Sequence, residues 1–462
     1  MLHETVRAHL KTFLAEMEQR GDGAGLPGFV VMSSSGYLAC GILANGFARV
    51  RCSSCGDEML VAFSCKGRGF CPSCTTRRMR GTSTHLLDRV LPHVPMRQWV
   101  LSLPRWARFL LARDPLLLTR TLDLALRAIF TLQRRRARRA GTRASRTGAV
   151  SFVQRFRGAL NLNVHFHCVI PDGVFVREEG SVRFIALPGP SDYEVTEVLR
   201  CIVQRLRKLL RPRLEAAQAD ARVPDALGSA QADSLALLHG NHPDAVRIKK
   251  QAAYLEGFSL HAGVHLHAND REGLAHLCGY GARPPLAQER LSRLPDGRLA
   301  YRLKRPITGR GEVLVLSPSE LLRRLAALVP PPRSHLVRYH GVFGPASAWR
   351  SEIVPRVQEG LVALLLAAST EPPPKAASRP RASRIPWAEL LLRVFREDVL
   401  LCSCGGRRVV LTFITEKKVV KVILEYLGLP TTGPPISPAR TSAAGEDTPR
   451  QDDLPELQQS LR

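Results

Sequence analysis

Between Val150 and Val176 the chain reads VSFVQRFRGALNLNVHFHCVIPDGVFV. β-Branched and aromatic residues recur with a period of two on both sides of Arg157-Gly158, which predicts two paired strands joined by a turn. In the second strand, alternate residues from Leu162 onward are apolar, and this pattern predicts a face buried in a core. The segment therefore predicts an antiparallel hairpin within a sheet.

The other face of that strand carries two histidines, His165 and His167, on either side of Phe166. Residues two apart on a strand point to the same side at a backbone separation of about 7 Å, so both imidazoles could bind one divalent cation. The plainer interpretation is a pair of surface histidines. A second pair, His265 and His267, has the same spacing but lacks the alternating polar face and precedes residues typical of a helix cap.

The rest of the pattern predicts an α+β fold in which an antiparallel sheet is flanked by helices. Further strands are expected at residues 98–103, 257–266, 298–304 and 312–316, and helices at 106–111, 116–132, 193–217 and 319–328. Another helix begins near Asp270 and has Tyr280 close to its C-terminal end, because Gly281 and Pro284 follow.

Two Cys-x-x-Cys knuckles, Cys52–Cys55 and Cys71–Cys74, lie fifteen residues apart. This spacing is typical of a structural zinc ribbon, in which four thiolates complete one tetrahedron. Cys40 and Cys65 are near enough in the sequence to supply a second or alternative ligand set. Because no secretion signal is recognisable, the cysteines indicate metal binding in a reducing cytoplasm rather than disulfides.

Near the C-terminus, Cys402 and Cys404 have a single residue between them. Two thiolates at this spacing chelate zinc poorly and no second pair is near in the sequence, so we expect no metal there. Residues 387–429 are expected to form a small unit. It lies between a Pro-rich linker at 371–386 and a tail at 430–462 whose composition is typical of a disordered segment.

The chain has 67 Lys and Arg against 40 Asp and Glu, a formal charge of +27. Such an excess repels itself unless a polyanion is close, so nucleic acid is the expected partner. Seven arginines fall within residues 134–146, either as a phosphate-binding run or as a solvated linker. Arg77 and Arg78 beside the second knuckle indicate that the zinc unit contacts DNA. No apolar run approaches the roughly 18 residues that cross a bilayer, so no membrane is expected.

Several motifs, taken in order, resemble the insertion sequence ninety-one family of bacterial transposases. CGILANGFARVRC from Cys40 and FSCKGRGFCPSC ending at Cys74 resemble that family's zinc-binding front. Downstream, FVQRF (152–156), ALNLNVHFH (159–167), PDGVF (171–175), YGARPP (280–285) and LVRYHGVF (336–343) resemble its His-hydrophobe-His (HUH) nuclease core. The resemblance covers most of residues 38 to 350. We expect an N-terminal helix and zinc-binding domain over residues 1–90, a catalytic domain over 91–350 and a helix at 351–370.

The resemblance also implies a reaction. Single-stranded ends of the element and its target would be nicked and rejoined in rolling-circle transposition, through a 5′-phosphotyrosine on Tyr280, which matches the family's catalytic tyrosine. His165 and His167 would hold Mg²⁺ or Mn²⁺, although imidazole also suits Zn²⁺. Tyr254, Tyr301 and Tyr339 are the competing nucleophiles, and Tyr339 is the most serious of them.

Two imidazoles hold an ion loosely, so a third ligand is expected. Gln154, on the adjacent strand, and His261, on the strand before the Tyr280 helix, are the candidates. Arg283 and Lys304 could bind the flanking phosphates.

The sequence departs from the family pattern at the predicted helix, where some members carry two tyrosines four residues apart. Here those positions hold His276 and Pro284, which leaves one nucleophile. One alternative is a decayed transposase that binds DNA through zinc without catalysis. Another is a replication initiator or relaxase, although the sequence lacks the Gly-x-x-x-x-Gly-Lys loop of helicase-bearing relaxases.

Overall fold

A computed structural model describes residues 1–21, 23–219, 225–236, 250–307, 311–355, 388, 390, 392 and 398–440. The expected linker at 371–386, most of the expected helix at 351–370 and the part of the tail beyond residue 440 lie outside these residues.

The largest sheet has six antiparallel strands in the order β13-β4-β5-β3-β9-β8. The strands are β3 (Met96–Ser102), β4 (Gly148–Phe156), β5 (Leu162–Pro171), β8 (Ala252–Leu255), β9 (Phe258–Leu266) and β13 (Val337–Gly341). The predicted hairpin is confirmed as β4 and β5, with the turn between Phe156 and Leu162. A two-stranded ribbon, β6 (Gly173–Glu178) and β7 (Ser181–Ala186), continues from β5.

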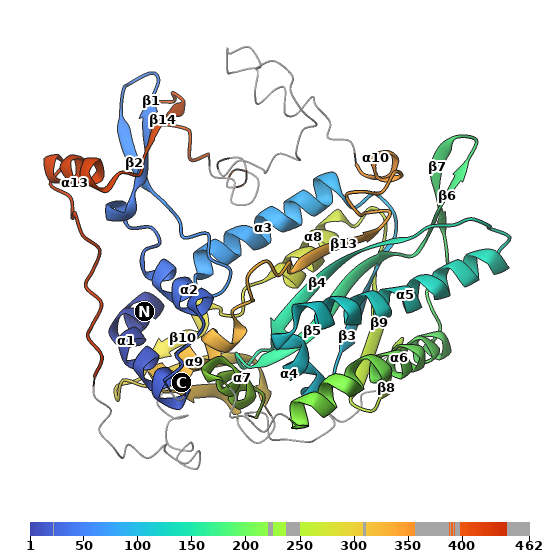
Figure 1. Ribbon diagram of the computed structural model, residues 1–462. Helices are drawn as coiled ribbons and strands as arrows, with labels where there is room; N and C mark the ends of the chain where they lie inside the picture. Colours follow the sequence, from blue (N-terminus) through green and yellow to red (C-terminus); the bar gives the residue numbers. More distant parts are fainter. Residues whose placement is uncertain are drawn as a thin grey trace.

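Three helices cover one face of this sheet: α4 (Arg105–Arg113), α5 (Pro115–Arg139) and α6 (Asp192–Ala219) (Figure 1). The alternate apolar residues of β5 face them and lie in one buried cluster, which confirms the predicted core face. The first part of the arginine run forms the last turns of α5. None of the described helices is both long enough and apolar enough to span a bilayer.

The opposite face of the sheet is covered over β4 and β5 by α3 (Pro72–Arg89) and α8 (Arg271–Ala282) (Figure 1). Asp270 caps α8, as expected, by accepting a hydrogen bond from Gly273 N (2.8 Å). The two helices are joined where Ser83 Oγ donates to Ala275 O (2.8 Å) and Arg271 donates to Leu87 O (2.6 Å). The position of α8 on the sheet therefore depends on α3.

The C-terminal end of α8 rests directly on β4. Gln154 donates its side-chain amide to the carbonyl oxygens of Tyr280 (2.6 Å) and Gly281 (3.1 Å). A Cβ atom at Gly281 would lie 2.6 Å from Cγ of Phe152, so only glycine permits this approach. Tyr280 is thereby fixed beside the polar face of β5.

A second core lies beside the large sheet. It joins α1 (Leu2–Arg20), α2 (Gly28–Leu38), α7 (Ala226–Ala236) and α9 (Pro318–Leu328) to a sheet of β10 (Leu291–Arg293), β11 (Leu299–Ile307) and β12 (Gly311–Leu316). The predicted strands at 298–304 and 312–316 and the predicted helix at 319–328 are confirmed here.

The third sheet joins the two ends of the chain. It has the order β14-β1-β2, where β1 (Phe47–Cys52) and β2 (Glu58–Ala62) form a hairpin and β14 (Arg408–Ile414) pairs with β1 (Figure 1). Helix α13 (Lys417–Tyr426) follows and places Val420 and Leu424 against Phe47. The described part of residues 387–429, expected to form a small unit, supplies β14 and α13, and β14 pairs with the edge of β1 in this sheet.

A buried ion pair fixes the corner after β5. Asp172 accepts from Arg97 Nε (2.8 Å), and Arg97 Nη1 also donates to Ala262 O (2.7 Å) on β9. His265 Nε2 lies 3.5 Å from the Asp172 carboxylate, so the second histidine pair borders an ion pair. Asp172 of the PDGVF motif is therefore explained by its buried ion pair with Arg97.

Replacing Gly281 with Ala is expected to lower the free energy of unfolding by about 1–3 kcal/mol, because the new methyl group overpacks the Phe152 ring. The matched control is Gly279→Ala on the same helix, where a Cβ meets nothing within 4 Å. That change should raise the free energy of unfolding by up to about 1 kcal/mol through helix propensity. Urea denaturation of both variants measures the difference, and equal effects would contradict this packing.

Asp172→Ala is expected to lower the free energy of unfolding by about 3–5 kcal/mol, because the Arg97 guanidinium is left buried without its carboxylate. Glu215→Ala, which breaks the exposed ion pair with Arg211 on α6, is the control and should leave stability unchanged. A small effect of Asp172→Ala in the same denaturation assay would show that the corner does not depend on this pair.

Candidate active site and metal centres

His165 and His167 lie on β5 with their rings 4.9 Å apart between centroids. Both side chains are buried, at 9% and 5% exposure, because α8 covers the polar face that the sequence alone would leave open to water. Burial lowers the pKa of His165 to about 4, and burial together with the charge of His165 lowers that of His167 to about 3. Both rings are therefore neutral at physiological pH, the form that binds metals.

Neighbouring groups orient the two rings. Nδ1 of His165 lies 2.8 Å from the carbonyl oxygen of Asn163 and donates to it, which leaves the Nε2 lone pair available. The side-chain nitrogen of Gln98 on β3 lies 3.1 Å from Nδ1 of His167. A lone pair on His167 Nε2 requires the ring proton on Nδ1, where the Gln98 amide oxygen accepts it once the amide is turned over. Sequence analysis missed Gln98, whose only signal was a polar residue in an otherwise apolar strand.

Gln154 pairs directly with His165 across β4 and β5. Among the described residues, Gln154 Oε1 and His167 Nε2 are buried without a hydrogen-bond partner. Buried polar atoms are normally satisfied, and an amide oxygen with two neutral imidazoles is a donor set that suits a divalent cation. His261 faces the same side of the sheet two strands from His167, about 10 Å away at the usual strand spacing. The geometry favours Gln154.

Tyr280 stands beside the histidine pair. Its ring centroid lies 5.5 Å from that of His167, and its side chain is 45% exposed, so a substrate can reach it. The guanidinium of Arg283 lies 4.5 Å from the centre of the Tyr280 ring. The Tyr280 phenol, the Arg283 guanidinium and two neutral imidazoles thus lie together on one face of the sheet.

The three competing tyrosines occupy other surroundings. Tyr301 is only 2% exposed, and its hydroxyl accepts from Ala287 N (3.4 Å). Tyr339 is on β13, at the edge of the sheet, where burial raises its pKa. Tyr254 lies on the opposite edge strand, β8, against the ring of His261 (5.3 Å). Of the four, Tyr280 is the tyrosine in ring contact with His167.

Arginines gather at the edge where β3 and β4 end and β5 begins. After burial, the positive charges of Arg108, Arg283 and Arg157 help to lower the pKa of His165, so all three lie within electrostatic range of it. Burial lowers the pKa of Arg108 to about 10, so it stays charged at neutral pH. Of these three, sequence analysis assigned phosphate binding only to Arg283, although the position of Arg157 directly after the end of β4 was a usable signal.

The other predicted phosphate-binding residues lie elsewhere. Lys304 is exposed on β11, in the sheet of the second core. Arg77 and Arg78 are exposed on α3, where Arg78 donates to Lys66 O (2.9 Å) in the cysteine-bearing loop. These positions fit a contact with DNA outside the histidine site.

The cysteines form two groups that differ from the predicted ribbon. In the first, which we call the inner cluster, the Sγ atoms of Cys40, Cys65, Cys71 and Cys74 lie within 4.8 Å of one another. In the second, the outer cluster, Cys52 and Cys55 meet Cys402 and Cys404 at the same spacing.

The expectation that Cys52, Cys55, Cys71 and Cys74 share one ion was therefore wrong, and Cys40 and Cys65 are full members of a set. The reason lies in the hairpin: Cys52 and Cys55 are at its tip, whereas β2 carries the chain roughly 17 Å back before Cys65. The expectation of no metal-binding arrangement at Cys402 and Cys404 is corrected as well, because β14 brings them to that tip.

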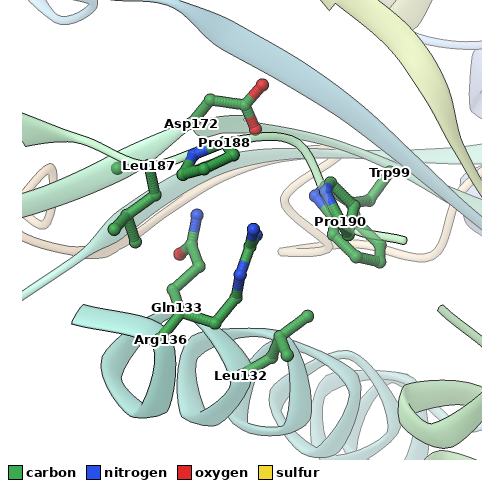
Figure 2. A pocket seen from close by; sticks show the side chains of 9 residues that line it. Trp99, Leu132, Gln133, Arg136, Asp172, Leu187, Pro188 and Pro190 are labelled. Carbon is green, nitrogen blue, oxygen red and sulfur yellow. The ribbon is translucent and has the colours of Figure 1, made fainter. Parts of the chain in front are cut away.

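A pocket lies on the helical side of the large sheet, between α5 and the segment after β7 (Figure 2). Gln133 and Arg136 point into it from α5, toward Asp172 and Pro188. Gln133 already donates to Pro171 O (2.6 Å) and accepts from Thr147 Oγ1 (2.8 Å). Because Trp99 lines the pocket from the core face of β3, the pocket is separated from the histidine pair by the sheet.

Comparison with known families gives two matches. A model described as "Transposase zinc-binding domain" matches residues 9–103, and one described as "Putative transposase" matches residues 148–350. The inner cluster lies within the first, and the histidine pair and Tyr280 lie within the second. No curated protein and no solved structure matches the chain.

The zinc-binding match and the two four-cysteine sets together support structural Zn²⁺ in this protein. The two family matches follow each other in the order expected from the motifs. The chain therefore belongs to the insertion sequence ninety-one family of transposases.

Proposed function

We propose that this transposase nicks and rejoins single-stranded DNA through a 5′-phosphotyrosine at Tyr280 during rolling-circle transposition in the cytoplasm. The observation that carries the proposal is the placement of Tyr280. It is exposed, in ring contact with His167, and held at its backbone carbonyl by Gln154, which also pairs with His165. Nucleophile and cation ligands thus belong to one rigid unit.

His165, His167 and Gln154 would hold Mg²⁺ or Mn²⁺. Gln154 Oε1 and His167 Nε2 are buried without a hydrogen-bond partner, and the bond from His165 Nδ1 to Asn163 O leaves the Nε2 lone pair of His165 for the ion. When bound, the ion would polarise the scissile phosphate and offset charge that develops on it. Burial keeps both imidazoles neutral, so proton competition for the ligand nitrogens is weak above the acidic range. We expect metal affinity to change little between pH 6 and 8.

In the reaction itself, the Tyr280 phenolic oxygen attacks phosphorus and loses its proton. The new bond joins this oxygen to phosphorus, and the bond from phosphorus to the 3′ oxygen breaks. The 3′ oxygen takes up a proton and leaves as a hydroxyl, which can later attack the phosphotyrosine and reverse the step. No high-energy cofactor is needed, because one phosphoester replaces another.

Arg108, Arg157 and Arg283 would bind the phosphates on either side of the reacting one. They lie within electrostatic range of His165, whereas Arg77 and Arg78 on α3 offer a second contact. The strand would then pass along the polar face of β5. With a single tyrosine on α8, one covalent link would form at a time.

We expect purified protein with Mn²⁺ to form a covalent adduct with labelled single-stranded oligonucleotides from the ends of its element, seen on a denaturing gel. Tyr280→Phe should abolish the adduct, because the attacking hydroxyl is missing. His165→Ala should reduce its rate about 100-fold or more, because cation binding is lost. Tyr339→Phe and Tyr254→Phe are the matched controls and should form the adduct normally.

An adduct that survives Tyr280→Phe would assign the nucleophile elsewhere. DNA binding without any adduct would favour the zinc-dependent DNA-binding protein instead. An adduct formed on a plasmid replication origin in preference to the element's ends would favour a replication initiator or relaxase.

We also expect Arg157→Gln to weaken binding of single-stranded DNA and to reduce the slope of log K against log salt by about 0.7, the contribution of one phosphate contact. Arg211→Gln, on the exposed side of α6, is the control and should leave the slope unchanged. Fluorescence anisotropy across a salt series measures both. An unchanged slope for Arg157→Gln would remove this arginine from the DNA path.

A further inference from the structure

The outer cluster joins two segments about 350 residues apart in the sequence, one of them beyond both family matches. We propose that Cys52, Cys55, Cys402 and Cys404 bind a second structural zinc ion, which fastens the C-terminal segment to the tip of the N-terminal hairpin. This proposal does not rest on the nicking chemistry.

The spacing of the sulfur atoms fits tetrahedral zinc. Cys52 Sγ lies 3.6 Å from Cys404 Sγ, and Cys55 Sγ lies 3.7 Å from Cys402 Sγ. Four sulfurs at the usual Zn–S distance of about 2.3 Å are about 3.8 Å apart. A disulfide would require about 2.05 Å, so these pairs are not bonded to each other.

Both knuckles direct backbone N–H groups at sulfur in the same way. Ser54 N donates to Cys52 Sγ and Gly406 N donates to Cys404 Sγ, each at 3.4 Å. The inner cluster repeats the arrangement, with Gly67 N donating to Cys65 Sγ at 3.3 Å. Such donors stabilise thiolates, the form that binds zinc. The single residue between Cys402 and Cys404 is therefore no obstacle.

The two knuckles fit closely together. Ser53 donates to Arg407 O from both its backbone nitrogen (2.9 Å) and its hydroxyl (3.0 Å). A Cβ atom at Gly406 would lie 2.4 Å from Ser54 Oγ, so the approach requires glycine. A cation lies beside the cluster: the pKa of Arg408 is raised first by its hydrogen bond to Asp57 (3.2 Å) and further by the thiolates of Cys402 and Cys52. Four thiolates with Zn²⁺ carry a net charge of −2, which Arg408 offsets only in part, because it is also paired with Asp57.

Apolar burial alone gives little stability to the sheet of β14, β1 and β2 with helix α13. Its buried cluster consists of Phe47, Val420 and Leu424, whereas Val409, Val410, Leu411 and Phe413 of β14 are exposed. Units with so small a core usually depend on a metal or disulfides. Zinc at the tip would supply the stability that the core lacks.

The direct test is the zinc content of the purified full-length chain, measured by mass spectrometry of the metal. We expect two zinc ions per chain, and one in the Cys402→Ser/Cys404→Ser variant. Cys65→Ser should also lose one, from the inner cluster, whereas Cys201→Ser on α6, outside both clusters, should keep two. One zinc in the parent chain and an unchanged value in the double variant would overturn the proposal.

A second measurement tests the fastening itself. A protease site inserted within residues 371–386 allows the backbone to be cut in the otherwise intact protein. We expect the two fragments to stay together in gel filtration with zinc, and to separate with a chelator or in the double serine variant. Co-elution of the serine-variant fragments would show that contacts other than the metal hold the segment, which would contradict a metal fastening.

Discussion

The contact between the end of α8 and the face of β4 is the constraint on which the rest of the site depends. Gln154 binds the last carbonyls of the helix, and Gly281 lets the backbone settle on the Phe152 ring. That contact buries the histidines, keeps them neutral and sets the tyrosine beside them. If α8 were displaced, His165 and His167 would become ordinary surface histidines, and Tyr280 would lose its ring contact with His167.

The inner cluster influences this contact from a distance. Cys71 and Cys74 are at the N-terminal end of α3, and the other end of α3 binds α8 through Ser83 and the carbonyl of Leu87. A metal held by the four sulfurs would fix one end of a helix whose far end supports the tyrosine helix. The zinc-binding domain is thus part of the framework that positions the helix bearing Tyr280.

Local pattern was enough to predict the hairpin of β4 and β5, the cap at Asp270 and the helix that bears Tyr280, because these depend on neighbours in the sequence. It was also enough to place the histidines on one face of a strand. Pattern could not show that α8 would bury that face, nor that Arg108 and Arg157 would meet at one edge, since both depend on packing between distant segments. The cysteines were grouped wrongly for the same reason: spacing describes each knuckle, whereas partner choice depends on where the hairpin carries it.

The pairing of β1 with β14 has a consequence for biosynthesis. A ribosome makes residues 408–414 more than 350 positions after residues 47–52. Until then, the hairpin of β1 and β2 has an unpaired edge, and the thiols of Cys52 and Cys55 lack their two partners. Any product that stops before residue 400, by frameshift or by premature release, would keep the histidines and the tyrosine but leave this sheet incomplete. Completion of this sheet therefore reports that translation has passed residue 414.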